Sequence, residues 1–360
     1  MSDPAHVLVL APNWLGDAVM ALPAIADVRA RFPSAQLTVA ARRAVVDVFR
    51  LVPFVDRRVT LQWSGRWWQR GVVAADAARL REIGSELAIL LPNSFAAAWL
   101  VKQAAVPARW GFGTDWRARL LSRAVPRPAG SMHQGAYYQH LTRELGIESG
   151  PLAPRLTVPD DQVAASRHLL IDSGWDASRP LVVLAPGAAY GTAKRWLPSY
   201  VAELATTLVR QRSSSCVLVG SRADAVTTRQ VLGLVGADAA PHVIDLTGKT
   251  TIEQLGGVLS LAHACVSNDS GAMHMAAAVG TPLVALFGPT REYETAPLTR
   301  EGCRAAVLTH PVWCRPCMLR ECPLDHRCMK GITPAHVLGS DPLNGSTQGV
   351  ESGHHRGLTP

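Results

Sequence analysis

Residues 265–275 read CVSNDSGAMHM and are followed directly by AAAVGTPLVALFGPT at 276–290. An apolar run ends in Asn268, Asp269, Ser270 and Gly271, and an Ala-rich stretch typical of a helix then begins. This pattern indicates a buried strand followed at once by a helix, as in α/β proteins. The start of such a helix either binds an anion through its unpaired backbone N–H groups, or is simply capped by Ser270 or Asp269.

The same alternation of apolar runs and helical stretches occurs in both halves of the chain. The expected strands are 6–11, 36–41, 87–92 and 109–113 in the first half, and 181–187, 214–220, 242–248, 264–269 and 283–289 in the second. The expected helices are 18–31, 73–83, 198–211, 223–235, 251–261 and 272–279. Continuous apolar strands separated by helices predict parallel sheets with right-handed crossovers, so we expect two α/β domains of the doubly wound type.

Length and composition set the domain organisation. A chain of 360 residues with 48% hydrophobic residues can bury two cores. The segment 148–160 is rich in Gly, Pro and Ser, which predicts domains at 1–155 and 156–338. Residues 339–360 lack aromatic residues and an apolar stripe, and we expect them to be a disordered tail.

The net charge of +8 favours an anionic partner. A nucleic-acid partner is not expected, because the basic residues are dispersed and no recognised binding module is present. The first 20 residues lack a basic region and a long apolar run, which predicts a cytoplasmic protein. In that compartment the seven cysteines are expected to be reduced thiols or metal ligands.

Ligands of open α/β sheets bind at the carboxyl ends of strands, so the strand-to-helix loops carry the candidate chemistry. After the strand near 181–187, the loop PGAAYGTAKRW contains Gly187, Thr192 and Lys194. Lys194 is placed to neutralise a diphosphate, although a solvated basic pair before a helix would have the same sequence. Asp17 follows the first strand, where it is either a helix cap or, across a cleft from a diphosphate, a general base.

These loops resemble those of glycosyltransferase family 9, the ADP-heptose:lipopolysaccharide heptosyltransferases, which have the GT-B fold. The matching motifs are NWLGDAVMALPAI, LPNSF, PGAAYGTAKRWLP and NDSGAMHMAAAVGTPLVALFGPT, in the family's order between about residues 6 and 335. The LPNSF and PGAAYGTAKRW loops resemble the family's heptosyltransferase II members more than its heptosyltransferase I members.

The resemblance implies an inverting transfer of heptose from ADP-L-glycero-D-manno-heptose to a heptose of the lipopolysaccharide inner core. Asp17 matches the family's proposed base, Lys194 the lysine on the donor diphosphate, and Asp269 the aspartate that holds the donor sugar. The resemblance also places the donor phosphate on the backbone N–H groups of the helix start. That helix start comprises Ser270, Gly271, Ala272 and Met273. No metal or other cofactor is then required for the leaving group to depart.

Other positions have two interpretations each. Asp224 resembles the family's acidic residue near the ribose, or is a surface carboxylate. His274 is expected to pack within its helix rather than to reach the phosphate. Asn93 and Ser94 either bind sugar hydroxyls of the lipid-linked Kdo/heptose acceptor or cap the next helix.

A basic and aromatic segment near residue 60 is a further candidate for acceptor binding. Arg66 lies in DRRVTLQWSGRWWQRG (56–71) among Trp63, Trp67 and Trp68. This segment either contacts a sugar phosphate or the membrane interface, or covers a neighbouring helix. The first interpretation would make the protein peripheral at the inner membrane.

Four of the cysteines form the pattern C-x2-C-x4-C-x5-C: Cys314, Cys317, Cys322 and Cys328. This spacing is compatible with a structural metal, either zinc or an iron–sulfur cluster, but it lacks the paired C-x2-C of the strongest zinc signatures. The alternative is a set of reduced or redox-sensitive thiols.

Two further functional hypotheses remain beside the main one. The first is a related GT-B enzyme of heptosyltransferase I or III type with another acceptor or sugar. The second is a non-catalytic protein that binds a nucleotide sugar.

Overall fold

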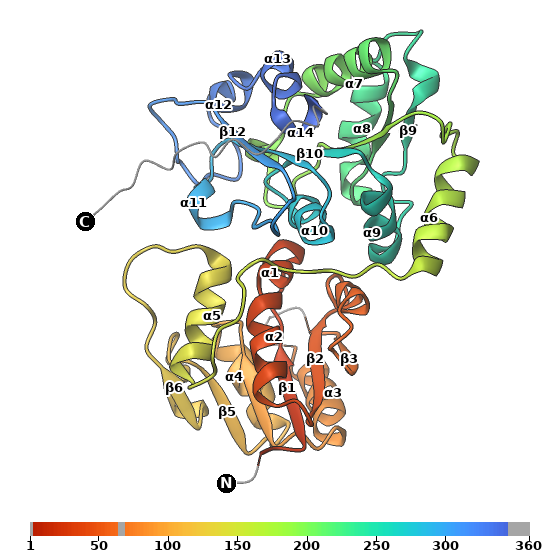
Figure 1. Ribbon diagram of the computed structural model, residues 1–360. Helices are drawn as coiled ribbons and strands as arrows, with labels where there is room; N and C mark the ends of the chain where they lie inside the picture. Colours follow the sequence, from red (N-terminus) through yellow and green to blue (C-terminus); the bar gives the residue numbers. More distant parts are fainter. Residues whose placement is uncertain (1–2, 64–68, 345–360) are drawn as a thin grey trace.

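A computed structural model describes residues 3–63 and 69–344 and contains two parallel six-stranded sheets. The two sheets and their helices lie one above the other, with the N-terminal half below and the C-terminal half above in Figure 1. The predicted α/β class with two parallel sheets is therefore confirmed.

The first sheet has the spatial order β3-β2-β1-β4-β5-β6. Its strands are β1 (His6–Leu10), β2 (Gln36–Arg42), β3 (Arg57–Leu61), β4 (Leu87–Leu90), β5 (Ala108–Phe112) and β6 (Arg123–Val125). The second sheet has the order β12-β11-β10-β7-β8-β9. Its strands are β7 (Leu181–Ala185), β8 (Ser215–Leu218), β9 (Val243–Asp245), β10 (Ala264–Asn268), β11 (Leu283–Phe287) and β12 (Ala305–Thr309).

Both sheets have the strand order of the Rossmann fold. In this order the first three strands are added towards one edge of the sheet and the last three towards the other edge, so the strand order reverses beside the first strand. The reversal falls between β1 and β4 in the first sheet and between β7 and β10 in the second, and each of these pairs is parallel. Ligands bind in the crevice that such a reversal opens at the carboxyl ends of the strands. The four loops with candidate chemistry follow these four strands.

Most helices lie between successive strands, as the alternating sequence predicts, and the last three follow the final strand. Those of the first half are α1 (Leu15–Met20), α2 (Leu22–Arg31), α3 (Arg70–Glu82), α4 (Phe95–Gln103) and α5 (Gln134–Glu144). Those of the second half are α6 (Asp160–Asp172), α7 (Pro198–Arg212), α8 (Ala225–Leu232), α9 (Ile252–Leu261), α10 (Gly271–Val279), α11 (Glu292–Thr295), α12 (Arg327–Lys330), α13 (Pro334–Leu338) and α14 (Asp341–Asn344). Since α5 packs on α2 and α6 packs on α9, the chain passes from one half to the other between residues 144 and 160.

Three strands were not expected from the sequence, and all of them lie at or next to sheet edges. All five residues of the central strands β7 and β11 are buried, which produces the continuous apolar runs in the sequence. The edge strand β12 alternates between exposed and half-buried residues, and β6 has only three residues. Edge strands need no second buried face, so they lack the apolar signal on which the prediction rested.

The expected disordered tail is wrong at its beginning. Residues 341–344 form α14, and Leu343 is 4% exposed and packs in the core of the second half. Pro342 and Leu343 are only two apolar residues in a segment rich in Gly, Ser and Asp, so they form no apolar pattern that would predict a helix. Within residues 3–63 and 69–344, no helix combines the length and the apolar character that a membrane span requires.

The two halves touch where α1 meets α10, at the centre of Figure 1. An ideal Cβ on Gly16 would lie 2.8 Å from Cδ2 of His274, and one on Gly271 would lie 2.9 Å from Cβ of Leu15. Only residues without a side chain allow this approach of the two helix starts. The contact brings the loop after β1 and the loop after β10 together.

Replacing Gly16 tests this packing. We expect Gly16→Ala to lower the free energy of unfolding by about 1–3 kcal/mol, because the new methyl group overlaps the buried ring of His274. Gly71→Ala is the matched control, since nothing lies within 4 Å of a Cβ built on Gly71. Urea unfolding of both variants measures the difference, and equal midpoints would show that α1 and α10 are not in close contact.

Candidate active site

The candidate site lies between the two sheets, where the starts of α1 and α10 meet. Asp17 comes from the first half, and Lys194 and Asp269 come from the second. The charges of Lys194 and Asp269 both act on the Asp17 carboxyl group, which shows that the three side chains share one region. This geometry agrees with the sequence prediction that the loops after β1, β7 and β10 face one another across the two halves.

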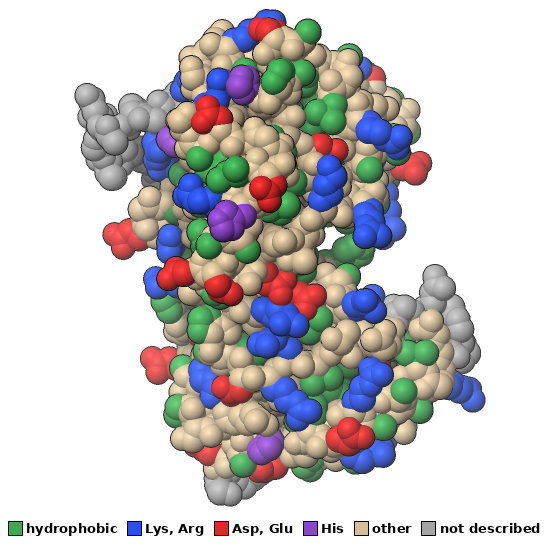
Figure 2. Space-filling view, turned by 90° about the vertical axis from the view of Figure 1, so that its right-hand side faces the viewer, with side chains coloured by type: hydrophobic (Ala, Val, Ile, Leu, Met, Phe, Trp, Pro, Cys, Tyr) green, Lys and Arg blue, Asp and Glu red, His purple; other side chains and the backbone are tan. Residues whose placement is uncertain are grey.

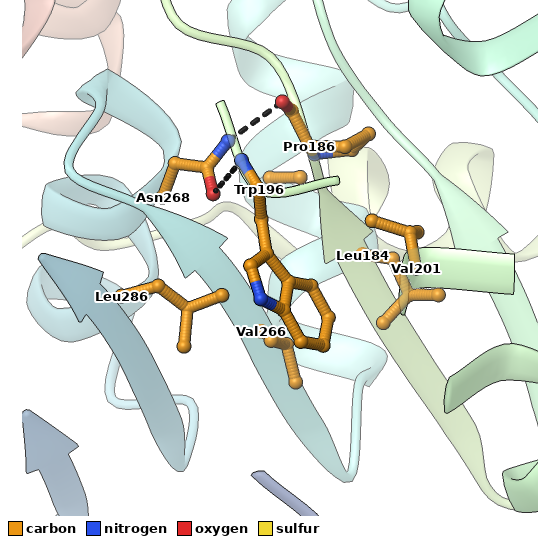
Figure 3. A pocket seen from close by; sticks show the side chains of 8 residues that line it. Leu184, Pro186, Trp196, Val201, Val266, Asn268 and Leu286 are labelled. Atoms are coloured by element: carbon orange, nitrogen blue, oxygen red, sulfur yellow. Dashed lines mark hydrogen bonds between the residues drawn. The ribbon is translucent and has the colours of Figure 1, made fainter. Parts of the chain in front are cut away.

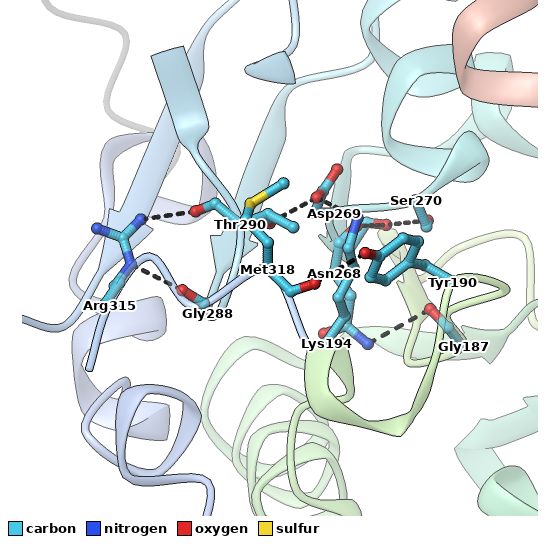
Figure 4. Close-up of polar contacts among 11 residues, drawn as sticks. Gly187, Tyr190, Lys194, Asn268, Asp269, Ser270, Gly288, Thr290, Arg315 and Met318 are labelled. Carbon is cyan, nitrogen blue, oxygen red and sulfur yellow. Dashed lines mark hydrogen bonds and ion pairs between the residues drawn. The ribbon is translucent and has the colours of Figure 1, made fainter. Parts of the chain in front are cut away.

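Lys194 and Asp269 form a buried ion pair. Lys194 Nζ lies 2.5 Å from Asp269 Oδ2, and the two side chains are 12% and 7% exposed. Thr290, three residues after the end of β11, donates its hydroxyl hydrogen to the same carboxylate oxygen at 2.7 Å. Lys194 Nζ also lies 4.8 Å from the ring centre of Tyr190, so a π-face helps to hold the ammonium group. Figure 4 shows these side chains converging from the loops after β7, β10 and β11.

The loop that carries Lys194 is held by Asn268, the last residue of β10. Asn268 Nδ2 donates to the carbonyl oxygen of Pro186 at 2.6 Å, and Asn268 Oδ1 accepts from the backbone N–H of Trp196 at 3.2 Å. Figure 3 shows both bonds beside the indole of Trp196, which fills the apolar space between the strands. The cavity seen there is lined mainly by apolar core residues, so it belongs to the packing that supports the loop and not to the site itself.

The start of α10 lacks the side-chain cap that the simpler interpretation of the sequence required. Ser270 is the N-cap residue, but its side chain accepts no hydrogen bond from the helix, and its Oγ lies 3.1 Å from Oγ of Ser267. The backbone N–H groups of Gly271, Ala272 and Met273 are therefore those that an anion would meet. The Met273 side chain is fully buried, so this residue can contribute only its backbone.

Asp17 is not the cap of its helix. The N-cap residue of α1 is Trp14, and Asp17 lies in the first turn. Burial raises the pKa of Asp17 to about 6, Lys194 lowers it in part, and the charge of Asp269 raises it further. A carboxylate with a pKa of about 6 is a better proton acceptor near neutral pH than an ordinary aspartate.

His274 packs between the helices, as the sequence predicted. Its side chain is buried and lies against Gly16. Burial lowers the pKa of His274 to about 4, so the ring is neutral at physiological pH. Tyr138 of α5 is also buried near Asp17, and burial together with the charge of Asp17 raises the pKa of its phenol well above the ordinary value.

Asp224 is not a surface carboxylate, because it is only 7% exposed. Its Oδ2 accepts from the backbone N–H of Ser221 at 2.9 Å and from the Ser221 hydroxyl at 2.7 Å. An ideal Cβ on Gly187 would lie 2.4 Å from Asp224 Cγ. Gly187 is therefore required by the packing of Asp224, and the loops after β7 and β8 are in contact. Contact of Asp224 with a ribose stays a prediction.

Thr192 is exposed at the start of the short 3-10 helix η3 (Thr192–Lys194). Its carbonyl oxygen accepts from the backbone N–H of Arg195 at 3.0 Å. This turn directs Lys194 towards Asp269. A contact between Thr192 and the donor stays a prediction.

Asn93 and Ser94 have different roles. Ser94 is the N-cap of α4 and accepts from the backbone N–H of Ala97 at 3.3 Å, so the capping interpretation holds for this residue. Asn93 Nδ2 donates to Tyr137 Oη at 2.8 Å. Its Oδ1 is buried and has no hydrogen-bond partner among the described residues. Because this oxygen is buried in the structure, contact between Asn93 and an acceptor hydroxyl stays a prediction.

The basic and aromatic segment is only partly described. Arg66, Trp67 and Trp68 lie outside the described residues. Trp63 is 6% exposed and packs in the hydrophobic core under α3 and α4, so for this residue the expected sugar or membrane contact is wrong. The indole fills the space between β3 and those helices, which is the alternative that the sequence left open.

Sequence reasoning missed Thr290, Tyr190, Tyr137 and Tyr138. Thr290 could have been found, because it directly follows the strand expected at 283–289, and ligand-binding residues gather at the carboxyl ends of such strands. Tyr190 could also have been found, because it lies in the loop PGAAYGTAKRW. Tyr137 and Tyr138 give no such signal, since they lie within α5 and not in a loop that follows a strand.

Of the two interpretations of the four-cysteine pattern, the metal site is not preformed. Among residues 3–63 and 69–344, no group of three His, Cys, Asp or Glu side chains is close enough together to hold a metal ion. Each of the seven cysteines is free.

The raised pKa of Asp17 has a consequence for stability. A proton binds Asp17 more tightly in the folded chain than in the unfolded chain, so the ionised carboxylate destabilises the fold above its ordinary pKa of 3.8. We expect Asp17→Asn to be more stable than the parent protein by about 1–3 kcal/mol at pH 7.5, and this advantage to vanish below the ordinary pKa. Thermal unfolding across this pH range measures it, with exposed Asp172→Asn as the control. A loss of stability at pH 7.5 would show that Asp17 is not desolvated.

Comparison with known proteins gives the family. A model of glycosyltransferase family 9 (heptosyltransferase) matches residues 74–327. Lipopolysaccharide heptosyltransferase 2 of Salmonella typhimurium is 31% identical, over 82% of this chain and 86% of that protein.

Solved structures agree with this match. The structure of E. coli ADP-heptose lipopolysaccharide heptosyltransferase II aligns with a TM-score of 0.78 and 28% identity, over 92% of this chain and 96% of that one. The E. coli heptosyltransferase WaaC with ADP shares the fold, with a TM-score of 0.69 and 18% identity over 92% and 97% of the two chains. The predicted GT-B fold and the predicted enzyme class, a glycosyltransferase, are confirmed. The chain belongs to glycosyltransferase family 9.

Proposed function

We propose that the protein transfers L-glycero-D-manno-heptose from ADP-heptose to the first heptose of the Kdo2-lipid A inner core of lipopolysaccharide. The relative named lipopolysaccharide heptosyltransferase 2 supports a heptose transfer to lipopolysaccharide, and the solved ADP-heptose lipopolysaccharide heptosyltransferase II supports ADP-heptose as the donor. The observation that carries the proposal is the placement of Asp17, a carboxyl group with a raised pKa, beside the Lys194–Asp269 pair and the uncapped start of α10.

In this proposal, Asp17 accepts the proton of the acceptor hydroxyl as its oxygen attacks the anomeric carbon of the donor. The bond between that carbon and the β-phosphate oxygen breaks, and ADP leaves with the bonding electrons. Attack from the face opposite to the leaving group inverts the configuration. Negative charge grows on the β-phosphate, where Lys194 and the backbone N–H groups of α10 stabilise it. In this proposal these groups neutralise the negative charge of the leaving phosphate, as a bound metal ion would, so no metal is needed at this step.

Asp269 has two functions in the proposal. One carboxylate oxygen, Oδ2, holds both Lys194 and Thr290. The other oxygen is then free to accept a hydrogen bond from a hydroxyl of the donor sugar. Gly187, Thr192 and Asp224 complete the donor site from the loops after β7 and β8, while Asn93 offers its unpaired oxygen to the acceptor. Arg66 is the proposed basic contact to the acceptor's phosphate.

The acceptor implies a location at the cytoplasmic face of the inner membrane, to which the protein would bind peripherally. The net charge of +8 favours an anionic lipid surface. Figure 2 shows blue and red side chains interspersed over both halves of one face, without the continuous basic stripe that a nucleic acid would need.

Substrate identity is tested by incubating the protein with ADP-heptose and monoheptosylated Kdo2-lipid A, followed by mass spectrometry of the lipid. We expect a product heavier by one heptose, together with released ADP. Parallel reactions with other nucleotide sugars, and with Kdo2-lipid A that lacks heptose, separate this function from a heptosyltransferase of type I or III. Absence of any glycosylated lipid with all donors and acceptors would favour a non-catalytic binding protein.

The role of Asp17 is tested by its pH dependence. We expect kcat/KM of the parent protein to fall about tenfold per pH unit below a pH of about 6, because the protonated carboxyl group cannot act as a base. Asp17→Asn should lower kcat by about 10²–10⁴-fold and leave the KM for the donor nearly unchanged. Asp172→Asn should retain both the rate and the pH profile. An Asp17→Asn protein with the parental rate would rule out this base.

A further inference from the structure

Four cysteines that the proposed reaction does not use surround one small cavity. Cys314, Cys317, Cys322 and Cys328 line it, with Ala193, Pro289, Leu324 and Arg327 completing the wall. The other three cysteines, Cys216, Cys265 and Cys303, lie elsewhere. The C-x2-C-x4-C-x5-C spacing noted in the sequence therefore brings all four thiols to one place in the folded chain.

The segment that supplies these thiols has little structure of its own. Residues 310–326 lie between β12 and α12 and contain no helix or strand. Met318 and His326 have left-handed backbone angles, with φ of 56° at each, which non-glycine residues adopt only when their surroundings hold them. A cross-link or a bound group would stabilise such an irregular segment.

The chemistry of the cavity wall fits a bound cation. A thiophilic metal deprotonates its cysteine ligands outright and is held by their thiolates. Arg327, which also forms an ion pair with Asp325, lies on the same wall and would offset part of the negative charge of a thiolate centre.

The cavity also sets limits on the geometry. The thiols surround a space and do not yet meet at one point, since no three metal-ligating side chains in the described part of the chain are in position for a single ion. Rotation about the one side-chain bond of cysteine redirects each sulfur atom, and binding of a single ion would require such rotations. A larger iron–sulfur cluster would instead occupy the space itself.

This segment supports the loop that carries Lys194. The backbone N–H of Ala193 donates to the carbonyl oxygen of Arg320 at 3.0 Å, and Tyr190 Oη donates to that of Met318 at 2.8 Å. An ideal Cβ on Gly191 would lie 2.2 Å from the oxygen of Arg320, so the two backbones are in close contact. Both acceptor carbonyls lie between Cys317 and Cys322.

The same segment also reaches the loop after β11. Arg315 Nε donates to the carbonyl oxygen of Gly288 at 2.7 Å, and its Nη2 lies 2.5 Å from Glu292 Oε2. Figure 4 shows Arg315 and Met318 on either side of Thr290. The loops that hold Lys194 and Thr290 are thus both braced by the cysteine-bearing segment.

We propose that Cys314, Cys317, Cys322 and Cys328 bind a thiophilic metal centre that fixes residues 310–326 against the loop of Lys194. The centre is structural and takes no part in the transfer of the sugar. Its effect on the donor site rests on the proposed function, but the metal site itself does not.

Metal analysis of the full chain tests the site. The protein is purified without chelators or metal-affinity resin, once in air and once under inert gas, and its zinc, iron and acid-labile sulfide are measured. We expect about one zinc or one iron per chain for a single ion, or about four irons with matching sulfide for a cluster. Metal below about a tenth of an equivalent in both preparations, with no uptake from added zinc or from iron and sulfide, would overturn the proposal.

Variants assign the metal to these residues. Cys322→Ser and Cys328→Ser are expected to lose most of the bound metal, and Cys303→Ser, which removes a half-buried thiol outside the cavity, is expected to keep it. Metal retained in both cavity variants would overturn the assignment.

Thiol titration of the native protein gives a result even if the variants fail to fold. Four more thiols should react after metal removal than before, while the fully buried Cys216 and Cys265 stay unreactive. Equal numbers of reactive thiols, or disulfide-linked peptides among the four cysteines, would contradict the proposal.

The link to the donor site is measured separately. Metal removal is expected to raise the KM for the nucleotide-sugar donor several-fold and to change kcat less. Bound metal with an unchanged KM would confine the centre to a structural role away from the donor. An inactive protein that still holds metal would refute the proposed function and leave the metal site standing.

Discussion

The close contact between the first turns of α1 and α10 is the constraint on which the site depends. These two helices belong to different halves of the molecule, and Gly16 and Gly271 allow their backbones to approach. Their contact places a carboxyl group of one half beside the buried ion pair of the other. The approach is costly, because it partly removes Asp17 from water, and this burial raises its pKa to about 6. That same desolvation makes the group a suitable base, so a destabilising feature of the fold becomes a functional one.

The Lys194–Asp269 ion pair is the other main component of the site. A buried ion pair adds little to stability, since desolvation offsets its attraction, and it persists where its geometry has another use. Here, Asp269 and Thr290 keep a single ammonium group oriented at the start of α10, whose first N–H groups receive no side-chain cap. An entering diphosphate would meet donors that are already in place, which lowers the cost of reorganisation during the reaction. The cysteine-bearing segment extends this support outwards from the loop of Lys194.

The features that could be predicted from the sequence are those with a periodic apolar pattern and those at the ends of strands. Central strands, helices and the loops with Asp17, Lys194 and Asp269 were found because buried parallel strands are continuously apolar and their carboxyl ends carry ligands. The edge strands β3 and β12 were missed because half-exposed strands lack that signal. Tyr138 and Asn93's partner Tyr137 were missed because only the folded chain brings α5 to the crevice. The distinction between Ser94 as a helix cap and Asn93 as a residue with a buried, unpaired side-chain oxygen needed atomic geometry.

The most direct measurement of the central claim is a crystal structure of the protein with ADP and an acceptor fragment bound. The account predicts the β-phosphate about 3 Å from Lys194 Nζ and from the backbone N–H groups at the start of α10, with the acceptor hydroxyl within hydrogen-bond distance of Asp17. A diphosphate bound away from α10, or an Asp17 carboxyl group that does not reach the acceptor in the closed complex, would contradict it.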